Sequence, residues 1–424
     1  MTGQNARYDS LLQRPKLGVA PIAPEGLVKI RCQRQGPLCL KNESRERYTE
    51  NFMITPRVDW AAIRSEFPAL ENWTYLNTAT YGMLPRRATA AVAQHFSRRD
   101  ELACWDFLDW FDDATRLRAK IGQLIGCGPE DIAFIPNAST GLGLLLTGLE
   151  WRSGDRILTL EHEFPNNFYA PGSLDRYGVE LQMCSWERMH ESVDERTRLV
   201  VASSVNYNTG FAPDFPELAA FLRQRGVLLY VDGTQSVGAL QFDTQRIQPD
   251  MLVVHGYKWM LAPNGAAFMY VHPRLRQSLR PTVVGWRSHR DWRNVENLHH
   301  GVPHLPEGAE RYEGGSVSFP VLYAMEASID LMLEIGPAAI EQRVLELANQ
   351  ARSLLCQLGA RVDGGASQIV AAKFEKRDAS ELAGKLSQQR VLITARRGHL
   401  RVSPHFYNNE QDLEKLRSAL LSLL

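Results

Sequence analysis

The chain has 424 residues, of which 44% are hydrophobic and 23% are charged, as is ordinary for a soluble globular protein. Its 48 basic and 48 acidic side chains cancel, so the composition gives no electrostatic reason to expect nucleic acid or an anionic membrane as a partner. No apolar run approaches the roughly 18 residues that a membrane span requires. The six cysteines are scattered without a C-x-x-C pair, and the N-terminus lacks the apolar region of a secretory signal. We therefore expect free thiols and a cytoplasmic protein.

The first 52 residues differ from the rest in composition, because they combine scattered basic residues with four prolines and no sustained periodicity. We expect residues 1–52 to be a disordered extension, or to reflect a start site placed before a true beginning at Met53. A transit peptide is the weaker alternative, since prolines interrupt an amphipathic helix. Residues 53–76 are expected to pack on the small domain. The remaining chain is expected to form a large domain over 77–314 and a small one over 315–424.

Strands alternate with helices through most of the chain. A short amphipathic helix over 59–67 and a strand near Tyr75 come first, and 86–126 has the pattern of a helix. Apolar runs typical of strands buried on both faces follow at 132–135, 156–160, 199–203, 227–231, 251–254 and 266–271. Repeated strand-then-helix units predict an α/β fold whose mostly parallel sheet is flanked by helices.

The C-terminal part has a different pattern, in which longer helices precede short strands. The expected elements are helices over 321–334 and 338–358, strands at 368–374, 391–394 and 399–403, and a closing helix from Asn409. Together they predict a smaller α+β domain after the large one.

Two polar residues follow predicted strands of the large sheet. Lys258 comes just after the strand at 251–254, and Asp232 ends the strand at 227–231. Open α/β sheets bind their ligands at the carboxyl ends of strands. An acid and a lysine at such ends are the pair that pyridoxal phosphate (PLP) chemistry needs, since the amine holds the aldehyde as a Schiff base and the carboxylate keeps the pyridine nitrogen protonated. The pair predicts PLP as the cofactor.

Two loops carry further signals. Small polar residues at 137–140 precede a run of leucines, so they predict either an anion site at a helix N-terminus or plain helix capping. The pair Gly141 and Gly143 is not a dinucleotide fingerprint, because the third glycine is missing. The loop over 285–314 is rich in Trp, His, Arg and Gly, but irregular spacing without partnered Cys or Asp favours a mobile active-site flap over a metal site. We expect no bound metal.

Six short motifs, taken in order, resemble those of class V aminotransferases, a group of fold-type I PLP enzymes that also holds cysteine desulfurases and kynureninases. The resemblance runs from about residue 58 to the end of the chain. Each motif alone is weak, but six in the family's order are specific. The motifs are Asn137-Ala-Ser-Thr140, Glu163-Phe-Pro-Asn-Asn167, Val205-Asn-Tyr-Asn-Thr-Gly-Phe211, Asp232-Gly-Thr-Gln235, Gly256-Tyr-Lys-Trp259 and Arg397-Gly-His-Leu-Arg-Val-Ser-Pro-His-Phe-Tyr407.

The resemblance implies roles for residues around the cofactor ring. Lys258 carries the cofactor and later moves the Cα proton of the substrate, and Asp232 pairs with the ring nitrogen. Gln235 is expected to reach the phenolic oxygen of the ring. Phe164 matches the position that stacks on the cofactor face.

The resemblance also implies a set of phosphate-binding residues, namely Ser139, Thr140, His255 and Tyr257. His255 departs from the family, which usually has a small hydroxyl or thiol residue there, and an imidazole would make the local charge depend on pH. Ser316 matches a hydroxyl residue that reaches the phosphate of the partner subunit. This match implies a homodimer with the site at the interface.

The substrate is expected to be an amino acid, gripped through its α-carboxylate. Arg401 is the first choice for this contact, because a guanidinium presents a planar fork to a carboxylate. Arg396 is the alternative, since it aligns better with the desulfurase arginine. Asn206 and Tyr207 compete in the same way for a contact near the ring.

Three functions remain open from the sequence. Aminotransfer is the leading one, and a Cβ–X lyase of the kynureninase or C–S lyase kind is its rival within catalysis. A PLP-fold binding module without turnover is the third, although the intact Lys258, Asp232 and Arg401 argue against it. Desulfuration through a persulfide is not expected, because residues 371–397 contain no cysteine.

Overall fold

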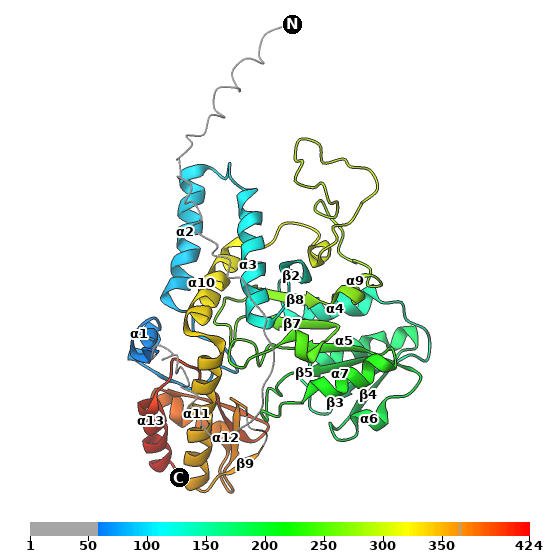
Figure 1. Cartoon of the computed structure of the whole chain (residues 1–424). Helices are drawn as coiled ribbons and strands as arrows, with labels where there is room; N and C mark the ends of the chain where they lie inside the picture. The colour runs from blue at the N-terminus through cyan, green and yellow to red at the C-terminus, as the bar shows by residue number, and fades with distance from the viewer. Residues whose placement is uncertain (1–57, 364, 366) are drawn as a thin grey trace, which may run out of the picture. The chain divides into compact units, whose positions relative to one another are not determined.

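A seven-stranded sheet forms the centre of the computed structural model, which describes residues 58–363, 365 and 367–424 (Figure 1). The predicted extension over 1–52 lies outside the described residues. The strand order is β2-β8-β7-β6-β5-β3-β4, and β8 alone runs against its neighbours. The strands are β2 (Ile132–Ile135), β3 (Arg156–Leu160), β4 (Glu180–Cys184), β5 (Thr197–Ser203), β6 (Leu228–Asp232), β7 (Met251–His255) and β8 (Ala267–Val271).

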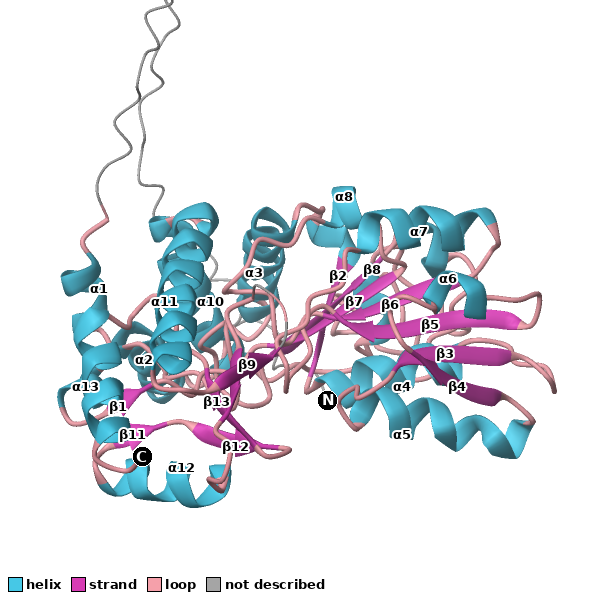
Figure 2. Ribbon diagram, turned by 90° about the horizontal axis from the view of Figure 1, so that it is seen from below, coloured by secondary structure: helices cyan, strands magenta, loops and turns pink. Residues whose placement is uncertain are grey.

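Helices cover both faces of this sheet, as Figure 2 shows, with α4 and α5 on one face and α6, α7 and α8 on the other. Alternate strand residues serve the two faces: Leu158 and Val200 belong to one apolar cluster, and Ile157 and Val201 to another. The helices are α4 (Ala138–Gly148), α5 (Asn166–Gly172), α6 (Met189–Ser192), α7 (Phe215–Gln224), α8 (Thr244–Ile247) and α9 (Pro273–Arg276). The predicted α/β class with a mostly parallel sheet is therefore confirmed.

A four-stranded antiparallel sheet of order β12-β13-β10-β9 forms a second layer near the C-terminus. Its strands are β9 (Arg361–Asp363), β10 (Val370–Lys373), β12 (Thr394–Arg396) and β13 (His399–Val402). The helices packed there are α11 (Pro337–Gln357), α12 (Ala379–Gln388) and α13 (Glu410–Leu421). The predicted smaller sheet is present, with β12 and β13 joined by a tight turn at Arg397 and Gly398.

The first described residues pack against this C-terminal part. Strand β1 (Thr74–Tyr75) pairs in parallel with β11 (Val391–Leu392). After α1 (Trp60–Ser65), the ring of Phe67 lies 4.7 Å from that of Tyr407. Arg64 pairs with the buried Asp412 at 2.7 Å. Short 3-10 helices occur at Pro68–Glu71, Pro129–Asp131, Ser173–Tyr177 and Ala309–Tyr312.

The prediction of one helix over 86–126 is wrong in one respect, because the structure has two helices in this range. Helix α2 (Arg86–Leu102) and helix α3 (Asp109–Ile125) are separated where Ala103 and Cys104 take left-handed φ values of 50° and 62°. Helix α10 (Phe319–Ile335) packs on both of them, as Figure 1 shows. α10 thus lies against the large sheet's own helices, and the predicted domain boundary at residue 315 stays a prediction.

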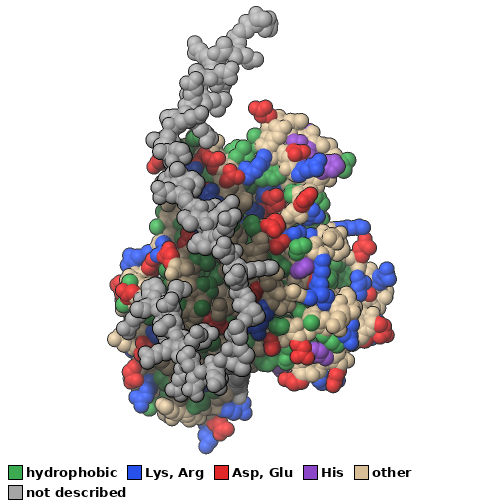
Figure 3. Space-filling model, in the orientation of Figure 1, with side chains coloured by type: hydrophobic (Ala, Val, Ile, Leu, Met, Phe, Trp, Pro, Cys, Tyr) green, Lys and Arg blue, Asp and Glu red, His purple; other side chains and the backbone are tan. Residues whose placement is uncertain are grey.

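The surface agrees with the neutral composition. On the face in Figure 3, acidic and basic side chains are interspersed. No described helix is long and apolar enough to cross a membrane. Among the described residues, no group of three or more His, Cys, Asp or Glu side chains could hold a metal ion.

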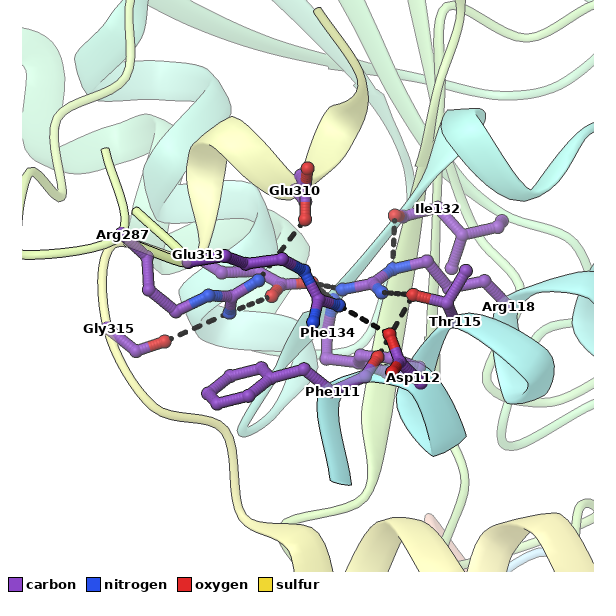
Figure 4. Close-up of polar contacts among 11 residues, drawn as sticks. Phe111, Asp112, Thr115, Arg118, Ile132, Phe134, Arg287, Glu310, Glu313 and Gly315 are labelled. Carbon is purple, nitrogen blue, oxygen red and sulfur yellow. Dashed lines mark hydrogen bonds and ion pairs between the residues drawn. The ribbon is translucent and has the colours of Figure 1, made fainter. Parts of the chain in front are cut away.

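A buried ion cluster fixes the segment that follows the 3-10 helix Ala309–Tyr312, as Figure 4 shows. The Glu313 carboxylate has no exposed surface and pairs with Arg118 at 2.5 Å and with Arg287 at 2.7 Å. It also accepts the N–H of Phe134 at 2.9 Å, and Arg287 donates to the carbonyl of Gly315 at 3.1 Å. Burial alone would raise the pKa of Glu313, but the two guanidinium groups outweigh it and the pKa is lowered. The cluster ties strand β2 to the segment that carries Ser316.

Replacing Glu313 by Gln is expected to lower the free energy of unfolding by about 3–5 kcal/mol at pH 7, because two buried arginines lose their shared counter-ion. Since the pKa of Glu313 is depressed, its contribution is present above the ordinary glutamate pKa and is lost as the pH falls through the folded value. Urea denaturation at pH 7 and below pH 4.5 measures both effects. The matched control is Glu310→Gln at the partly exposed neighbour of Arg287, for which a change under about 1 kcal/mol is expected. Equal losses in both variants would contradict this account.

Candidate active site

A cavity of about 240 Å³ lies where strands β5, β6 and β7 end and helix α4 begins. Parallel strands bring their carboxyl ends to one edge of the sheet, so polar residues that are far apart in the sequence meet there. The lining residues are Asn137, Ala138, Ser139, Phe164, Asn166, Ser203, Tyr207, Asp232, Thr234, Gln235, His255, Tyr257 and Lys258. Seven of the predicted site residues are among them.

Lys258 lies three residues beyond β7 and is almost fully buried. Its Nζ is 5.4 Å from the centre of the Phe164 ring and 5.3 Å from that of Tyr257. Burial lowers the pKa of Lys258 to about 7, the charge of Asp232 opposes this shift, and Arg401 adds to it. The amine is therefore largely deprotonated at slightly alkaline pH, as a nucleophile toward an aldehyde must be.

The backbone beside Lys258 is held by a glycine that the sequence analysis did not single out. The N–H of Gly82 donates to the carbonyl of Tyr257 at 2.9 Å. A Cβ at Gly82 would lie 1.9 Å from the carbonyl oxygen of Lys258, so only glycine permits this close approach.

Asp232 is the last residue of β6 and is buried. One of its oxygens accepts the N–H of Thr234 at 2.9 Å. Burial raises the pKa of Asp232, while the hydrogen bonds from Thr234 and the charge of Lys258 lower it in part. A carboxylate with a raised pKa attracts a proton strongly. It is therefore suited to accept a hydrogen bond from a protonated ring nitrogen, such as that of a pyridinium.

Gln235 is buried beside the cavity, and both ends of its amide have partners. Its Oε1 accepts the indole N–H of Trp259 at 2.8 Å, and its Nε2 donates to the carbonyl of Ala79 at 3.1 Å. The second hydrogen on Nε2 is left for a ligand oxygen, as the predicted contact with a phenolic oxygen requires.

The part of the cavity that helix α4 lines has the features of an anion site. Asn137 caps α4 by accepting the N–H of Thr140 at 2.9 Å, and Ser139 lies exposed in the first helical turn. The Thr140 hydroxyl also bonds Asn137, at 3.2 Å, and Thr140 does not line the cavity. The N–H groups of a helix N-terminus bind anions. The capping alternative is therefore present at this turn, and anion binding stays a prediction.

His255 and Tyr257 also line the cavity, with ring centres 4.4 Å apart. The buried Nε2 of His255 has no hydrogen-bond partner among the described residues. Burial lowers the pKa of His255 to about 4, and the charge of Lys258 adds to the effect. Buried polar atoms are normally hydrogen-bonded, so the unpaired nitrogen of this neutral imidazole is available to a bound ligand.

The predicted substrate residues lie outside the lining of this cavity. Arg401, on β13, is 1% exposed and donates to the carbonyl of Tyr207 at 2.6 Å and to the Thr80 hydroxyl at 2.5 Å. Within the described part of the chain it has no carboxylate partner, and its Nε is unpaired. Arg396 is half-buried and donates to Thr394 and to the carbonyl of Ala395, both on its own strand. Between the two arginines, Arg401 is the one with an uncompensated buried charge.

Asn206 and Ser316 are placed differently from the cavity residues. The Asn206 side chain closes a turn, since its oxygen accepts the N–H groups of Asn208 and Thr209, both at 3.0 Å. Tyr207, its competitor, lines the cavity with its ring 5.3 Å from that of Phe164. Ser316 is exposed and does not line the cavity of its own chain.

Comparison with known proteins decides the family. The model of the family described as aminotransferase class-V matches residues 109–416. The chain belongs to this family. It is 29% identical over 398 residues to the isopenicillin N epimerase of Streptomyces clavuligerus, covering 86% of this chain and 98% of that protein. It is 25% identical over 361 residues to the uncharacterized aminotransferase YcbU of Bacillus subtilis, covering 82% and 94%.

Solved structures confirm the fold. A mutant of C-DES with glycine linked to its PLP cofactor superimposes with a TM-score of 0.79 at 24% identity, over 84% of this chain and 98% of that one. The resemblance drawn from the six motifs is therefore confirmed, as are the fold type, the enzymatic nature of the chain and its dependence on PLP. The donor set fits this cofactor, because the cavity is lined by an amine, a buried carboxylate and the first turn of a helix, whose N–H groups suit a phosphate.

The pKa of Lys258 leads to a measurable pH dependence. We expect the rate at which cofactor-free protein captures PLP to rise with pH through about 7 and to level off above it, because only the neutral amine attacks the aldehyde. Stopped-flow absorption after mixing with PLP measures this rate. A midpoint near the ordinary lysine value of 10.5 would show that the amine is not perturbed as described.

Proposed function

We propose that the chain is an aminotransferase that acts on an α-amino acid, with Lys258 and Asp232 as its catalytic residues. One observation carries this proposal: a buried amine and a buried carboxylate line one cavity, where the neighbouring strands β6 and β7 end. PLP, when bound, supplies an electron sink for the carbanion left at Cα. The lysine Nζ is the one basic amine of the cavity and therefore the group that removes and returns the Cα proton.

The surrounding residues orient these two groups. Asp232 fixes the charge at the ring nitrogen, and the Phe164 ring supplies an apolar face against which the cofactor ring packs. Ser139, with His255 and Tyr257 beside it, holds the phosphate, and Gln235 offers its remaining hydrogen to the ring oxygen. Each of these roles is supported by a position on the cavity wall.

Arg401 is the proposed grip for the α-carboxylate. Its guanidinium is buried without an acidic partner in the described part of the chain, so a substrate carboxylate would supply the missing charge. Arg396 keeps a supporting role in this scheme, because both arginines lower the pKa of Lys258.

Arg401→Lys is expected to raise KM for the amino acid about 10-fold or more, since an ammonium cannot replace the planar fork. The matched control is Arg396→Lys, which keeps the same net charge and should change KM by less than about 3-fold if Arg401 makes the contact. Steady-state kinetics measure KM for both variants. A larger rise in KM for Arg396→Lys than for Arg401→Lys would assign the carboxylate contact to Arg396.

A homodimer is part of the proposal. Ser316 is exposed in a segment held rigidly by Glu313, and exposed apolar side chains, Val283, Val284 and Trp286, lie in the adjoining stretch. A Cβ at Gly314 would touch Val283, so the two stretches are in contact. A second copy that covers this surface would bring Ser316 to the phosphate of the other cavity.

Cβ–X lyase activity is the second candidate. The tight turn at Arg397 and Gly398 leaves no loop for a persulfide cysteine, so a lyase here would have to release its product without that step. The lysine and acid serve both reactions, and the orientation of the substrate's bonds decides between them.

The deciding experiment is a visible absorption scan of the PLP-loaded protein with a panel of amino acids and no keto acid. An aminotransferase is expected to convert its cofactor to pyridoxamine phosphate with one of them and to stop after a single turnover. Continued release of a keto acid and ammonia, or of a cleaved side chain, would establish the lyase instead. Lys258→Ala is the control and should lose the visible band and all turnover while remaining folded. No change with any amino acid would favour a binding module.

A further inference from the structure

A second carboxylate lies behind Asp232 and has no part in the function proposed above. Glu163 belongs to the loop between β3 and α5 and is 8% exposed. Its Oε1 accepts the N–H of Ser203 at 2.6 Å. Its Oε2 accepts the Ser203 hydroxyl at 2.5 Å, the Asn167 amide at 3.1 Å and the N–H of Phe164 at 3.1 Å. Four donors and no acceptor around these two oxygens suit an ionised carboxylate, which only accepts hydrogen bonds.

These contacts connect Glu163 to Asp232 by two routes. Asn167, which has no exposed surface, donates to Glu163 and to the Ser203 hydroxyl, each at 3.1 Å, and its amide lowers the pKa of Asp232. Ser203 ends β5 and is the direct register partner of Asp232 on β6. Both residues that hold Glu163 in place are therefore immediate neighbours of the acid expected to face the ring nitrogen.

The charges around this pair are unbalanced. The facing titratable groups are Asp232 and Tyr230 on β6 and Lys258 after β7, and no described lysine, arginine or histidine forms an ion pair with Glu163. Burial raises the pKa of Glu163, the hydrogen bonds from Ser203 and Asn167 lower it, and Asp232 raises it again. Lys258 acts on Asp232, whereas the donors that contact Glu163 are neutral. The excess negative charge favours a proton on any basic nitrogen bound beside Asp232.

We propose that Glu163 is a positioning residue that, through Asn167 and Ser203, holds the Asp232 carboxylate in place and adds a second negative charge behind it. The consequence is that the ring nitrogen of PLP stays protonated to a higher pH than Asp232 alone would allow. This inference rests on the proposed function, because it assumes that Asp232 faces the ring nitrogen. It assigns Glu163 no contact with substrate or cofactor.

The test uses the full chain loaded with PLP that carries ¹⁵N in its ring. The ring ¹⁵N chemical shift reports protonation directly and needs no turnover. Glu163→Gln removes the charge at nearly constant shape, and we expect the change to the unprotonated shift to occur about 1 pH unit lower than in wild type. In Glu163→Asp, which keeps the charge, the pH of the ¹⁵N transition should return most of the way to its wild-type value. If Glu163→Gln does not fold, Glu163→Ala serves with the same expected fall.

The controls separate the failure of this inference from failure of the proposed function. Glu161→Gln removes a charge from an exposed position in the same loop and should leave the ¹⁵N transition unchanged. Asp232→Asn should lower the pH of the ¹⁵N transition by more than Glu163→Gln does, because it removes the carboxylate expected to face the nitrogen. If Asp232→Asn resembles wild type, or if wild type binds no PLP, the proposed function is wrong at that point. If Asp232→Asn behaves as expected while Glu163→Gln coincides with wild type, the role of Glu163 is overturned.

Discussion

The burial of one amine is the constraint on which the site depends. Taking Lys258 out of water costs free energy unless the amine is neutral, and this cost is what brings its pKa to about 7. Two features keep Lys258 from forming a stable buried ion pair with Asp232. Asp232 accepts a hydrogen bond from Thr234, and Arg401 lies near enough to oppose protonation of the lysine amine. Gly82 completes the arrangement, because any side chain there would push the lysine backbone out of place.

Several polar groups near this amine lack partners, which is unusual for buried groups. Within the described chain, the Nε2 of His255 and the Nε of Arg401 are both buried without a hydrogen bond. In the proposed function they lie where a phosphate and a substrate carboxylate would bind. One neutral imidazole and one buried guanidinium are thus left with hydrogen-bonding capacity that two anionic ligands would use.

The parts of the fold that could be predicted are those whose sequence pattern has one physical meaning. Strands β5, β6 and β7 are buried on both faces, so their apolar runs were sufficient. Strand β4 was missed because it lies at the sheet edge and is mostly exposed, so its composition is that of a loop. The break between α2 and α3 was missed because Ala103 and Cys104 carry no turn signal, and tertiary packing imposes their left-handed backbone.

The same distinction applies to the site. Lys258 and Asp232 could be placed from strand ends alone, since topology brings such ends together. Glu163 could not be given a role, although it stands in a recognised motif, because a buried acid satisfied by neutral donors looks in sequence like any surface glutamate. Nor could the sequence choose between Arg401 and Arg396, because burial and the absence of an acidic partner are properties of the folded chain.

Arg401 also shows how the two sheets are made to act together. It belongs to β13 of the small sheet, yet its guanidinium donates to the Tyr207 carbonyl in the loop after β5 and to Thr80 in the loop after β1. The guanidinium has five N–H donors and uses two of them in these bonds, so its Nε–H and two further hydrogens are left for a substrate carboxylate. A charged acceptor forms a stronger hydrogen bond than a neutral one, so in the proposed function this contact would be favourable without breaking the bonds that join the sheets. Recognition of the substrate would then depend on the same side chain that connects the two sheets.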